Sequence, residues 1–337
     1  MTHSNFPIID LHCHFEGSIQ PEKSYEILHR HGHAIAQNYQ EFLPQVIGFN
    51  PEKNAFFDAI SILDMCLLDG QSVQDVTDDL IRRAAAQNVK ILEVSFAPRS
   101  FKLQKPQRAR LHAFMDAFLT TIDTSTHHHD IAVGVTMLIL PSHLEPAYRD
   151  AHGDIRDLIL EYRDFLTGVD ICTLDFFNKY PELECQLPKI FETVKDAGLH
   201  LSAHAGEFYD AHPVEKAIEL GAERIGHGIR TIHNQQVLER VKEHNITLEI
   251  CPISNYKTGA ITANSEHPLR KLLKAGVRVT INSDDQGVQN SNWRDDYDFA
   301  MHTIGLSEYE IRMCLRYSYE ASFLPLERKN IYRDLFV

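Results

Sequence analysis

The sequence has no excess of positive charge and no long hydrophobic run. Its 337 residues include 33 lysines and arginines against 47 aspartates and glutamates, a formal net charge of −14. This charge disfavours a phosphate backbone or an anionic membrane surface as partner and suits a small neutral or cationic ligand. No uninterrupted apolar segment approaches the roughly 18 residues of a membrane span, and residues 1–7 lack the basic and apolar regions of a secretory signal. We therefore expect no nucleic-acid or membrane partner.

Paired cysteines are also missing. The six cysteines are Cys13, Cys66, Cys172, Cys185, Cys251 and Cys314, and they form no C-x-x-C pair. A chain of this length with 43% hydrophobic residues can bury a sizeable core and does not need disulfides. We predict reduced thiols, a cytoplasmic location and an ordinary globular protein in which residues 1–337 form a single domain.

Short apolar runs alternate with longer segments of helical period. The runs comprise residues 8–12, 91–97, 131–140, 168–174, 199–204, 224–227, 246–251 and 277–282. Between them, apolar residues such as Val73, Val76 and Leu80 recur at three- and four-residue spacing, which is typical of a helix with one buried face. Eight strand and helix units predict an α/β fold, a closed (β/α)8 TIM barrel. An open doubly wound sheet is the alternative, disfavoured because no glycine-rich phosphate loop follows the first run.

Two helical segments add to the predicted barrel. Residues 19–71 form a long insert between the first and second strands, and residues 293–337 form a tail. No linker, low-complexity stretch or further repeat interrupts the alternation.

Histidines and aspartates stand at the ends of several predicted strands. They are His12 and His14 at the first strand, His204 at the fifth, His227 at the sixth, and Asp284 and Asp285 after the eighth. In a (β/α)8 barrel the carboxyl ends of all strands meet at one rim, where the active site lies. His12 and His14 are two positions apart, so a strand directs both imidazoles to one face. Side chains gathered from four distant strands predict a metal site.

The predicted ligands are His12, His14, His204 and Asp284. This nitrogen-rich set suits zinc and leaves one coordination position for water, with iron, cobalt or manganese as alternatives. A second metal would need a bridging lysine or glutamate after the fourth strand, where residues 172–176 read Cys-Thr-Leu-Asp-Phe. We therefore predict one Zn²⁺ per chain, which would lower the pKa of a bound water toward ~7.

Two further side chains can act on protons beside this metal. Glu207 stands three positions after His204, beyond Gly206. It would donate a proton to the electrophile, which requires burial to raise its pKa against the pull of the cation. His227 would orient or deprotonate the attacking water.

Five motifs follow one another in a fixed order. They are His12-x-His14 with Glu16-Gly17-Ser18, His204-Ala-Gly-Glu207, Gly226-His227-Gly228, Cys251-Pro252-x-Ser254-Asn255, and Ser283-Asp284-Asp285. From about residue 8 to residue 325 they resemble the motifs of the adenosine deaminase family, within the amidohydrolase superfamily. The resemblance implies zinc on His12, His14, His204 and Asp284.

The same resemblance implies a role for the remaining site residues. Glu207 would protonate N1 of a purine, His227 would hold the attacking hydroxide, and Asp285 would accept a hydrogen bond from the N7 side. Hydroxide adds at C6, and ammonia leaves. The helical insert would supply a lid and the apolar pocket walls. Glu16 would lie where the family binds the ribose 5′-hydroxyl, and Thr173 at the purine N3 edge.

The sequence departs from the family pattern at three places. Phe176-Phe177 stands near a small Gly-Asp-Glu-like turn of the family and would reshape the pocket floor. Gln286-Gly287 replaces a proline after the paired aspartates and would loosen a loop beside the ligand. Glu16 replaces the aspartate of adenosine-specific members and is more familiar in relatives that deaminate free adenine or modified aminopurines.

The sequence as a whole predicts a zinc-dependent aminohydrolase acting at C6 of a 6-aminopurine nucleoside or base, nominally converting adenosine to inosine and ammonia. One alternative is a deaminase of free adenine or a modified aminopurine. Another is an amidohydrolase acting on a different heterocycle, an amide or a lactone. A third is a purine-binding barrel without catalysis, which Glu207 and His227 disfavour because binding alone would not require both. The oligomeric state stays open.

Overall fold

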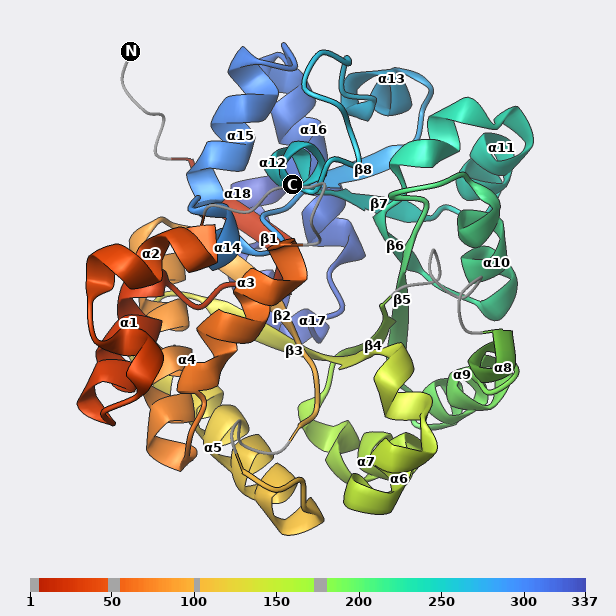
Figure 1. Cartoon of the computed structure of the whole chain (residues 1–337). Helices are drawn as coiled ribbons and strands as arrows, with labels where there is room; N and C mark the ends of the chain where they lie inside the picture. The colour runs from red at the N-terminus through yellow and green to blue at the C-terminus, as the bar shows by residue number, and fades with distance from the viewer. Residues whose placement is uncertain (1–5, 48–54, 100–103, 173–180) are drawn as a thin grey trace.

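The computed structural model describes residues 6–47, 55–99, 104–172 and 181–337, which include one sheet of eight parallel strands (Figure 1). The strands are β1 (Ile8–His14), β2 (Val89–Phe96), β3 (Ala132–Ile139), β4 (Gly168–Ile171), β5 (His200–Ala205), β6 (Arg224–His227), β7 (Thr247–Ile250) and β8 (Arg278–Ile281). Each strand pairs with the next in sequence order. His14 N donates to Asp284 O at 3.0 Å and Asp284 N donates to His12 O at 2.9 Å, which joins the end of β8 to β1. The protein is a (β/α)8 TIM barrel, as the sequence predicts.

Helices surround the strands (Figure 1). The α-helices are α1 (Pro21–Arg30), α2 (Tyr39–Ile47), α3 (Ala55–Leu63), α4 (Gly70–Ala86), α5 (Arg108–Thr126), α6 (Pro146–His152), α7 (Ile155–Tyr162), α8 (Pro181–Glu184), α9 (Leu187–Asp196), α10 (His212–Leu220), α11 (Gln235–Glu243), α12 (Pro252–Lys257), α13 (Leu269–Lys274), α14 (Gln286–Gln289), α15 (Trp293–His302), α16 (Glu308–Ala321), α17 (Leu326–Lys329) and α18 (Arg333–Phe336). Short 3-10 helices lie at Ala34–Ala36, Asp64–Cys66, Pro141–Leu144, Arg163–Phe165, Ile229–His233 and Asn330–Tyr332.

Helix α4 shows how local sequence sets these elements. Asp69 accepts the Ser72 N–H at 2.9 Å and donates its own N–H to the Ser72 hydroxyl at 2.9 Å, a capping box that fixes where the helix begins. Val73, Val76 and Leu80 are buried, as their spacing predicts. The helix therefore packs one apolar face against the barrel.

The strands differ from their predicted bounds by a few residues. β1 continues to His14 rather than ending at His12, because the backbone bonds with Asp284 extend it. β4 ends at Ile171, and predicted strand residues 173–174 lie outside the described residues. β1 and β3 are buried along their whole length, which is usual when helices cover the outside of a barrel and side chains fill it.

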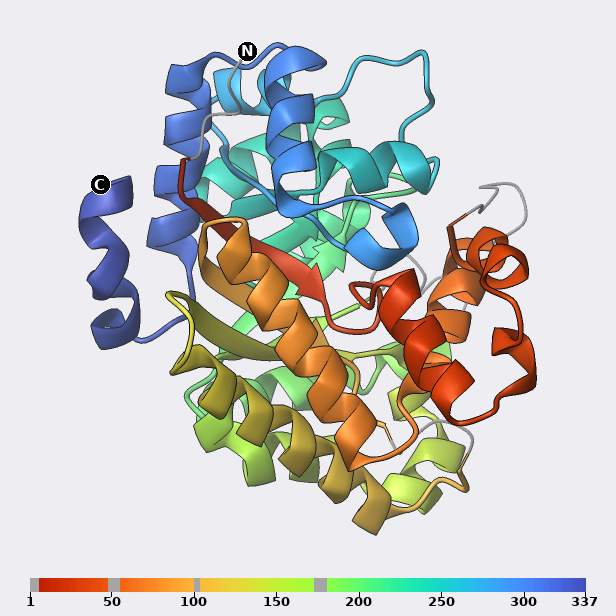
Figure 2. The same ribbon diagram turned by 90° about the vertical axis from the view of Figure 1, so that its left-hand side faces the viewer.

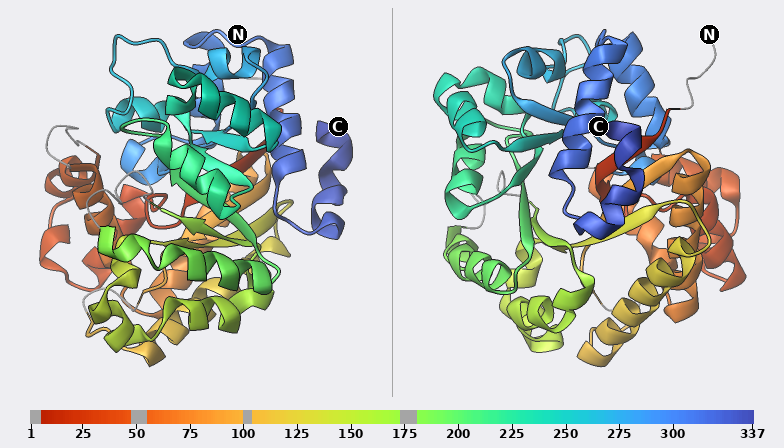
Figure 3. Two further views of the ribbon diagram at one scale, coloured as in Figure 1. Left: turned by 90° about the vertical axis from the view of Figure 1, so that its right-hand side faces the viewer. Right: turned by 180° about the vertical axis from the view of Figure 1, so that it is seen from behind.

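Helices α17 and α18 of the tail lie at the end of the barrel opposite to the insert, as Figures 2 and 3 show. Helices α2 and α3 of the insert contact α14, which follows Asp285 at the carboxyl end of β8. In the tail, the Phe323 ring packs on Arg224, the first residue of β6. Among the described residues, none of the helices has both the length and the apolarity that crossing a bilayer requires.

Candidate active site

Three strand ends bring the predicted metal ligands together. β1 carries His12 and His14, β5 carries His204, and Asp284 follows β8; all four are buried, and we call them the His/Asp cluster. His14 Nε2 lies 3.1 Å from His204 Nε2 and 3.2 Å from Asp284 Oδ1, and His12 Nε2 lies 3.6 Å from the same oxygen. In a tetrahedral zinc site with bonds of about 2.0–2.1 Å, ligand atoms lie about 3.3 Å apart. The ligand atoms of His12, His14 and Asp284 are therefore close enough to share one ion of this size, and His204 lies beside them.

In His12 and His204, the ring nitrogen that faces away from the cluster, Nδ1, lies within hydrogen-bonding distance of a carboxylate. His12 Nδ1 lies 2.7 Å from Glu249 Oε2, and His204 Nδ1 lies 3.1 Å from Asp170 Oδ1. Burial opposes ionisation of Asp170, but His204 holds its pKa below the usual range. Each carboxylate accepts from Nδ1, so the Nε2 lone pair points into the cluster, as a metal ligand requires. Buried His12 Nε2 makes no hydrogen bond within the described part of the chain, which fits a bound ion.

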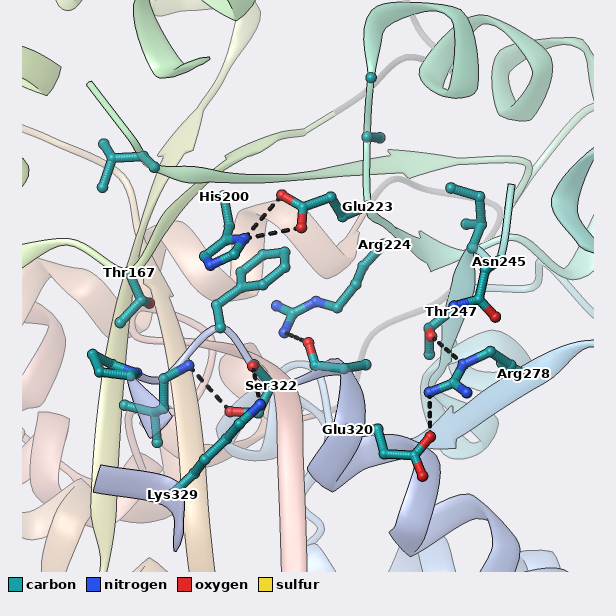
Figure 4. Close-up of a pocket in the computed structure, with 18 of the residues that line it drawn as sticks. Thr167, His200, Glu223, Arg224, Asn245, Thr247, Arg278, Glu320, Ser322 and Lys329 are labelled. Atoms are coloured by element: carbon teal, nitrogen blue, oxygen red, sulfur yellow. Dashed lines mark hydrogen bonds and ion pairs between the residues drawn. The ribbon is translucent and has the colours of Figure 1, made fainter. Parts of the chain in front are cut away.

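Arg224 holds Glu249 from the amino end of the barrel. Its Nε lies 2.5 Å from Glu249 Oε1 and its Nη1 lies 2.8 Å from Glu93 Oε2, and no side chain of the three is more than 2% exposed. The guanidinium carbon lies 3.5 Å from the centre of the Phe323 ring. Figure 4 shows Arg224 in a cavity of about 790 Å³ lined by the first residues of β5 to β8. Glu249 thus connects the cavity wall to His12.

Sequence reasoning missed Glu249, Asp170 and Arg224. Glu249 and Asp170 are charged residues inside short strands that are otherwise apolar or uncharged, Thr247–Ile250 and Gly168–Ile171. A buried charge needs a partner. A charged residue inside an apolar strand was therefore the available signal. It does not identify the partner of each carboxylate.

The backbone beside the cluster is strained. His227 and Asp284 have φ values of 61° and 62°, in the left-handed region that non-glycine residues seldom adopt. Such residues cost about 1–3 kcal/mol each and are found where the surroundings fix them, often at functional sites. Gly226 is required for packing, because a Cβ there would lie 2.7 Å from His12 Cε1 and 3.2 Å from His204 Cγ. The imidazoles therefore pack directly against bare backbone.

The two predicted catalytic residues face each other beside the cluster. His227 Nε2 lies 3.4 Å from Glu207 Oε2 and 4.0 Å from Asp284 Oδ2. Thr258 donates its hydroxyl hydrogen to Glu207 Oε1 at 3.2 Å. Burial lowers the pKa of His227 well below its usual value, so the ring is neutral. A carboxyl group and a neutral imidazole at this spacing can transfer a proton and orient a nucleophile.

Adjacent Asp284 and Asp285 have opposite electrostatic environments. Burial opposes ionisation of Asp284, but the neighbouring His12 and His14 rings hold its pKa well below the usual range. Burial and the neighbouring Asp284 raise the pKa of Asp285. The Ser254 hydroxyl donates to Asp284 Oδ2 at 2.6 Å, so this motif serine contacts the cluster. Asp284 is suited to a cation and Asp285 to a hydrogen-bonded ligand.

Glu16 is buried and forms an ion pair with Arg99, which is partly exposed. Its Oε1 lies 2.7 Å from Arg99 Nη2 and accepts the Ala97 N–H at 3.1 Å. Arg99 also pairs with Asp64, just after α3 of the insert. Glu16 is only 3% exposed. Two carboxylates and one guanidinium therefore link β1, β2 and the insert at the rim of the site.

Two expectations about the pocket rim have different outcomes. Thr173, Phe176 and Phe177 lie outside the described residues. The loosened loop at Gln286-Gly287 is wrong: both residues are buried at the start of α14. Gly287 N donates to Gly17 O at 2.9 Å, and a Cβ at residue 287 would overlap the Ile19 carbonyl. Glycine here allows a close backbone approach rather than a loose loop.

A (β/α)8 barrel with buried histidines and an aspartate at the carboxyl ends of its strands is an arrangement suited to metal-dependent hydrolysis. Residues 7–336 match the family model described as adenosine deaminase. The chain belongs to the adenosine deaminase family and is a hydrolytic deaminase. The alternative of a purine-binding barrel without catalysis is therefore wrong.

Relatives with two different names are about equally similar. An adenosine deaminase from Shewanella denitrificans is 28% identical over 344 residues, covering 98% of this chain and 99% of the relative. An adenine deaminase from Cupriavidus metallidurans is 30% identical over 324 residues, covering 95% and 87%. Family membership therefore indicates an aminopurine, and the choice between base and nucleoside depends on the pocket.

Solved structures share the fold. An adenine deaminase from Arthrobacter aurescens has a TM-score of 0.82 at 23% identity and covers 98% of both chains. An amidohydrolase from Burkholderia ambifaria with bound Zn has a TM-score of 0.80 at 19% identity, covering 98% of this chain and 90% of the other. At these identities the likeness supports the barrel.

Proposed function

We propose that the protein is a zinc-dependent hydrolase that deaminates C6 of a 6-aminopurine nucleoside or base, with adenosine as the nominal substrate. The observation that best supports this is the His/Asp cluster, in which the ligand atoms of His12, His14 and Asp284 lie close enough to share one ion. Glu207 Oε2 and His227 Nε2 lie beside it, 3.4 Å apart. When bound, zinc supplies a water acidic enough to act as a nucleophile near neutral pH. Three histidines and one carboxylate favour zinc among the candidate ions.

The protein's own groups would orient the purine and move its protons. Glu207 delivers a proton to N1, which makes C6 more electrophilic, and the oxygen nucleophile held by His227 adds at C6. The hydrogen of the new C6 hydroxyl then passes to the amino group, the C6–N bond breaks, and ammonia leaves as the C6 carbonyl forms. In a nucleoside N7 is a hydrogen-bond acceptor, so Asp285 has to donate to it, the reverse of the direction expected from the sequence. The buried environment of Asp285 favours the protonated carboxyl that this donation needs.

Free adenine is the second candidate substrate, and the Glu16–Arg99 ion pair favours it. Glu16 stands where the family binds the ribose 5′-hydroxyl, yet its Oε1 is already occupied by Arg99 and the Ala97 N–H. A ribose hydroxyl would have to displace one of these two contacts or bind the other carboxylate oxygen, Oε2. A bare base would leave the pair intact.

Ammonia release from a substrate panel tests the proposal. Zinc-loaded protein is offered adenosine, 2′-deoxyadenosine, adenine, AMP and N6-methyladenosine, with Glu207→Gln as the matched inactive control. For N6-methyladenosine the released amine is methylamine, which is measured in place of ammonia. Release from at least one compound, abolished in the control, is the expected result. A clear preference for adenine would assign the bare base, and a preference for adenosine the nucleoside. No release from any of the five, with one zinc bound per chain, would overturn the proposal.

A further inference from the structure

Three buried side chains form a continuous hydrogen-bonded line from α13 to His227. The Leu269 backbone N–H donates to His267 Nδ1 at 3.1 Å. His267 Nε2 lies 3.3 Å from Asn255 Oδ1, and Asn255 Nδ2 lies 3.1 Å from His227 Nδ1. The exposed fractions of His267, Asn255 and His227 are 2%, 0% and 2%. Water therefore does not replace any of these bonds.

Each bond in this line has only one possible direction. A backbone N–H can only donate, so His267 Nδ1 must be the acceptor. Burial lowers the pKa of His267 to about 3, so the ring is neutral and carries its single hydrogen on Nε2. That hydrogen goes to Asn255 Oδ1, which turns the amide Nδ2 toward His227. The amide donates to His227 Nδ1, so this nitrogen carries no hydrogen and the hydrogen of the ring is on Nε2.

We propose that His267 and Asn255 are positioning residues that lock His227 as a hydrogen-bond donor through Nε2, so that His227 orients the attacking water and does not deprotonate it. This inference rests on the proposed deaminase function. It chooses between the two roles that the sequence leaves open for His227. Glu207 Oε2, 3.4 Å from His227 Nε2, is then the group that takes the proton. An O–H bond of the water breaks, the proton passes through Glu207, and an N–H bond forms at purine N1.

Nitrogen NMR of the histidine rings tests the tautomer directly, in both zinc-free and zinc-loaded protein. The chain has 20 histidines, so the His227 signals are assigned by their loss in His227→Gln. We expect a protonated Nε2 and an unprotonated Nδ1 in the wild type. Asn255→Asp replaces the amide donor by an acceptor and should move the hydrogen to Nδ1. A wild-type ring with its hydrogen on Nδ1 would overturn the proposal.

Two substitutions at His267 test whether this residue positions His227 or only supports the fold. His267→Gln keeps an acceptor for Leu269 and a donor for Asn255, so kcat should stay within about threefold of wild type. His267→Phe removes both and should lower kcat about 10- to 100-fold, as losses of outer-shell partners do, with KM changed less than about threefold. Equal kcat in the two variants would contradict the proposal.

His143 provides the matched control for the spectra. Its Nδ1 accepts the Leu140 N–H at 3.1 Å, as His267 accepts that of Leu269, but it has no link to His227 in the described structure. His143→Phe should leave the His227 nitrogen shifts unchanged, whereas His267→Phe should move them. If His267→Phe does not fold, the wild-type and Asn255→Asp spectra still decide the matter. The tautomer and the proposed function can fail separately. If His227 shows the expected tautomer but the protein deaminates no aminopurine, the proposed function is refuted and the tautomer assignment stands.

Discussion

The structure allows the effect of Arg224→Met on stability and on metal binding to be estimated in most detail. The substitution keeps a long apolar side chain and removes the only cation that the structure shows paired with both Glu93 and Glu249 in the described barrel interior. Breaking a buried ion pair in this way costs about 3–5 kcal/mol, because a charge is left buried without a partner. This is a large part of the about 5–15 kcal/mol that stabilises a typical folded chain.

The same substitution should weaken metal binding, because Glu249 contacts both Arg224 and the predicted ligand His12. Glu249 Oε2 fixes His12 Nδ1 at 2.7 Å, and losses in the shell around metal ligands lower affinity about 10- to 100-fold. Zinc at 100 times its Kd stabilises a protein by about 2.7 kcal/mol, and at 10 times by about 1.4 kcal/mol. A tenfold weaker site should therefore lose about 1.3 kcal/mol of zinc stabilisation at fixed zinc concentration.

Urea unfolding with chelator and with zinc separates these two effects. We expect Arg224→Met to lose about 3–5 kcal/mol in chelator and a further ~1.3 kcal/mol in zinc. Arg278→Met is the control, because Arg278 lines the same cavity but pairs with Glu320 at 2.9 Å rather than with a neighbour of the cluster. The reasoning would be refuted by a loss below about 1 kcal/mol, or by identical losses with and without zinc.

Three further predictions follow from the site and its surroundings. Glu207→Gln should keep zinc bound yet lower kcat by at least about 10²-fold, since one positioned proton donor contributes this much; near-normal turnover would remove Glu207 from the mechanism. Gly226→Ala should raise the zinc Kd at least about tenfold, because its Cβ would lie 2.7 Å from His12 Cε1; unchanged affinity in a chelator competition would show that the packing is not needed. Burial lowers the pKa of His143 to about 3, so the folded state binds fewer protons than the unfolded state below pH ~6.5, and stability is lost as pH falls. Between neutral pH and pH 5, His143 should contribute about 2 kcal/mol to this loss in urea unfolding, so the loss should be smaller by that amount in His143→Gln. An equal loss in that variant would rule out His143 as a source.

The rim position of the site could be predicted from sequence because it depends on local features. His12, His14 and His204 each stand at the end of an apolar run, and parallel strands in a barrel bring such ends together whatever their separation in sequence. The pairing of His14 Nε2 with His204 Nε2 at 3.1 Å joins residues 190 positions apart, yet no long-range information was needed to expect it.

The groups that support the ligands could not be assigned in this way. Glu249 lies 237 positions from His12, and on a strand buried on both faces alternation does not say which side chain meets which. The wrong expectation for Gln286 and Gly287 has a similar cause, because their environment also depends on long-range packing. Glycine after two aspartates suggests a loose turn, but the close approach of the Ile19 carbonyl depends on how the insert packs.

Zinc reconstitution with ammonia measured on the same samples tests the central claim most directly. Chelator-treated protein is titrated with zinc, bound metal is counted per chain, and ammonia release is followed with adenosine and adenine. The account predicts no release without metal and activity that rises in proportion to zinc up to one per chain. Full activity in chelator, or one bound zinc per chain with no ammonia from either compound, would contradict it.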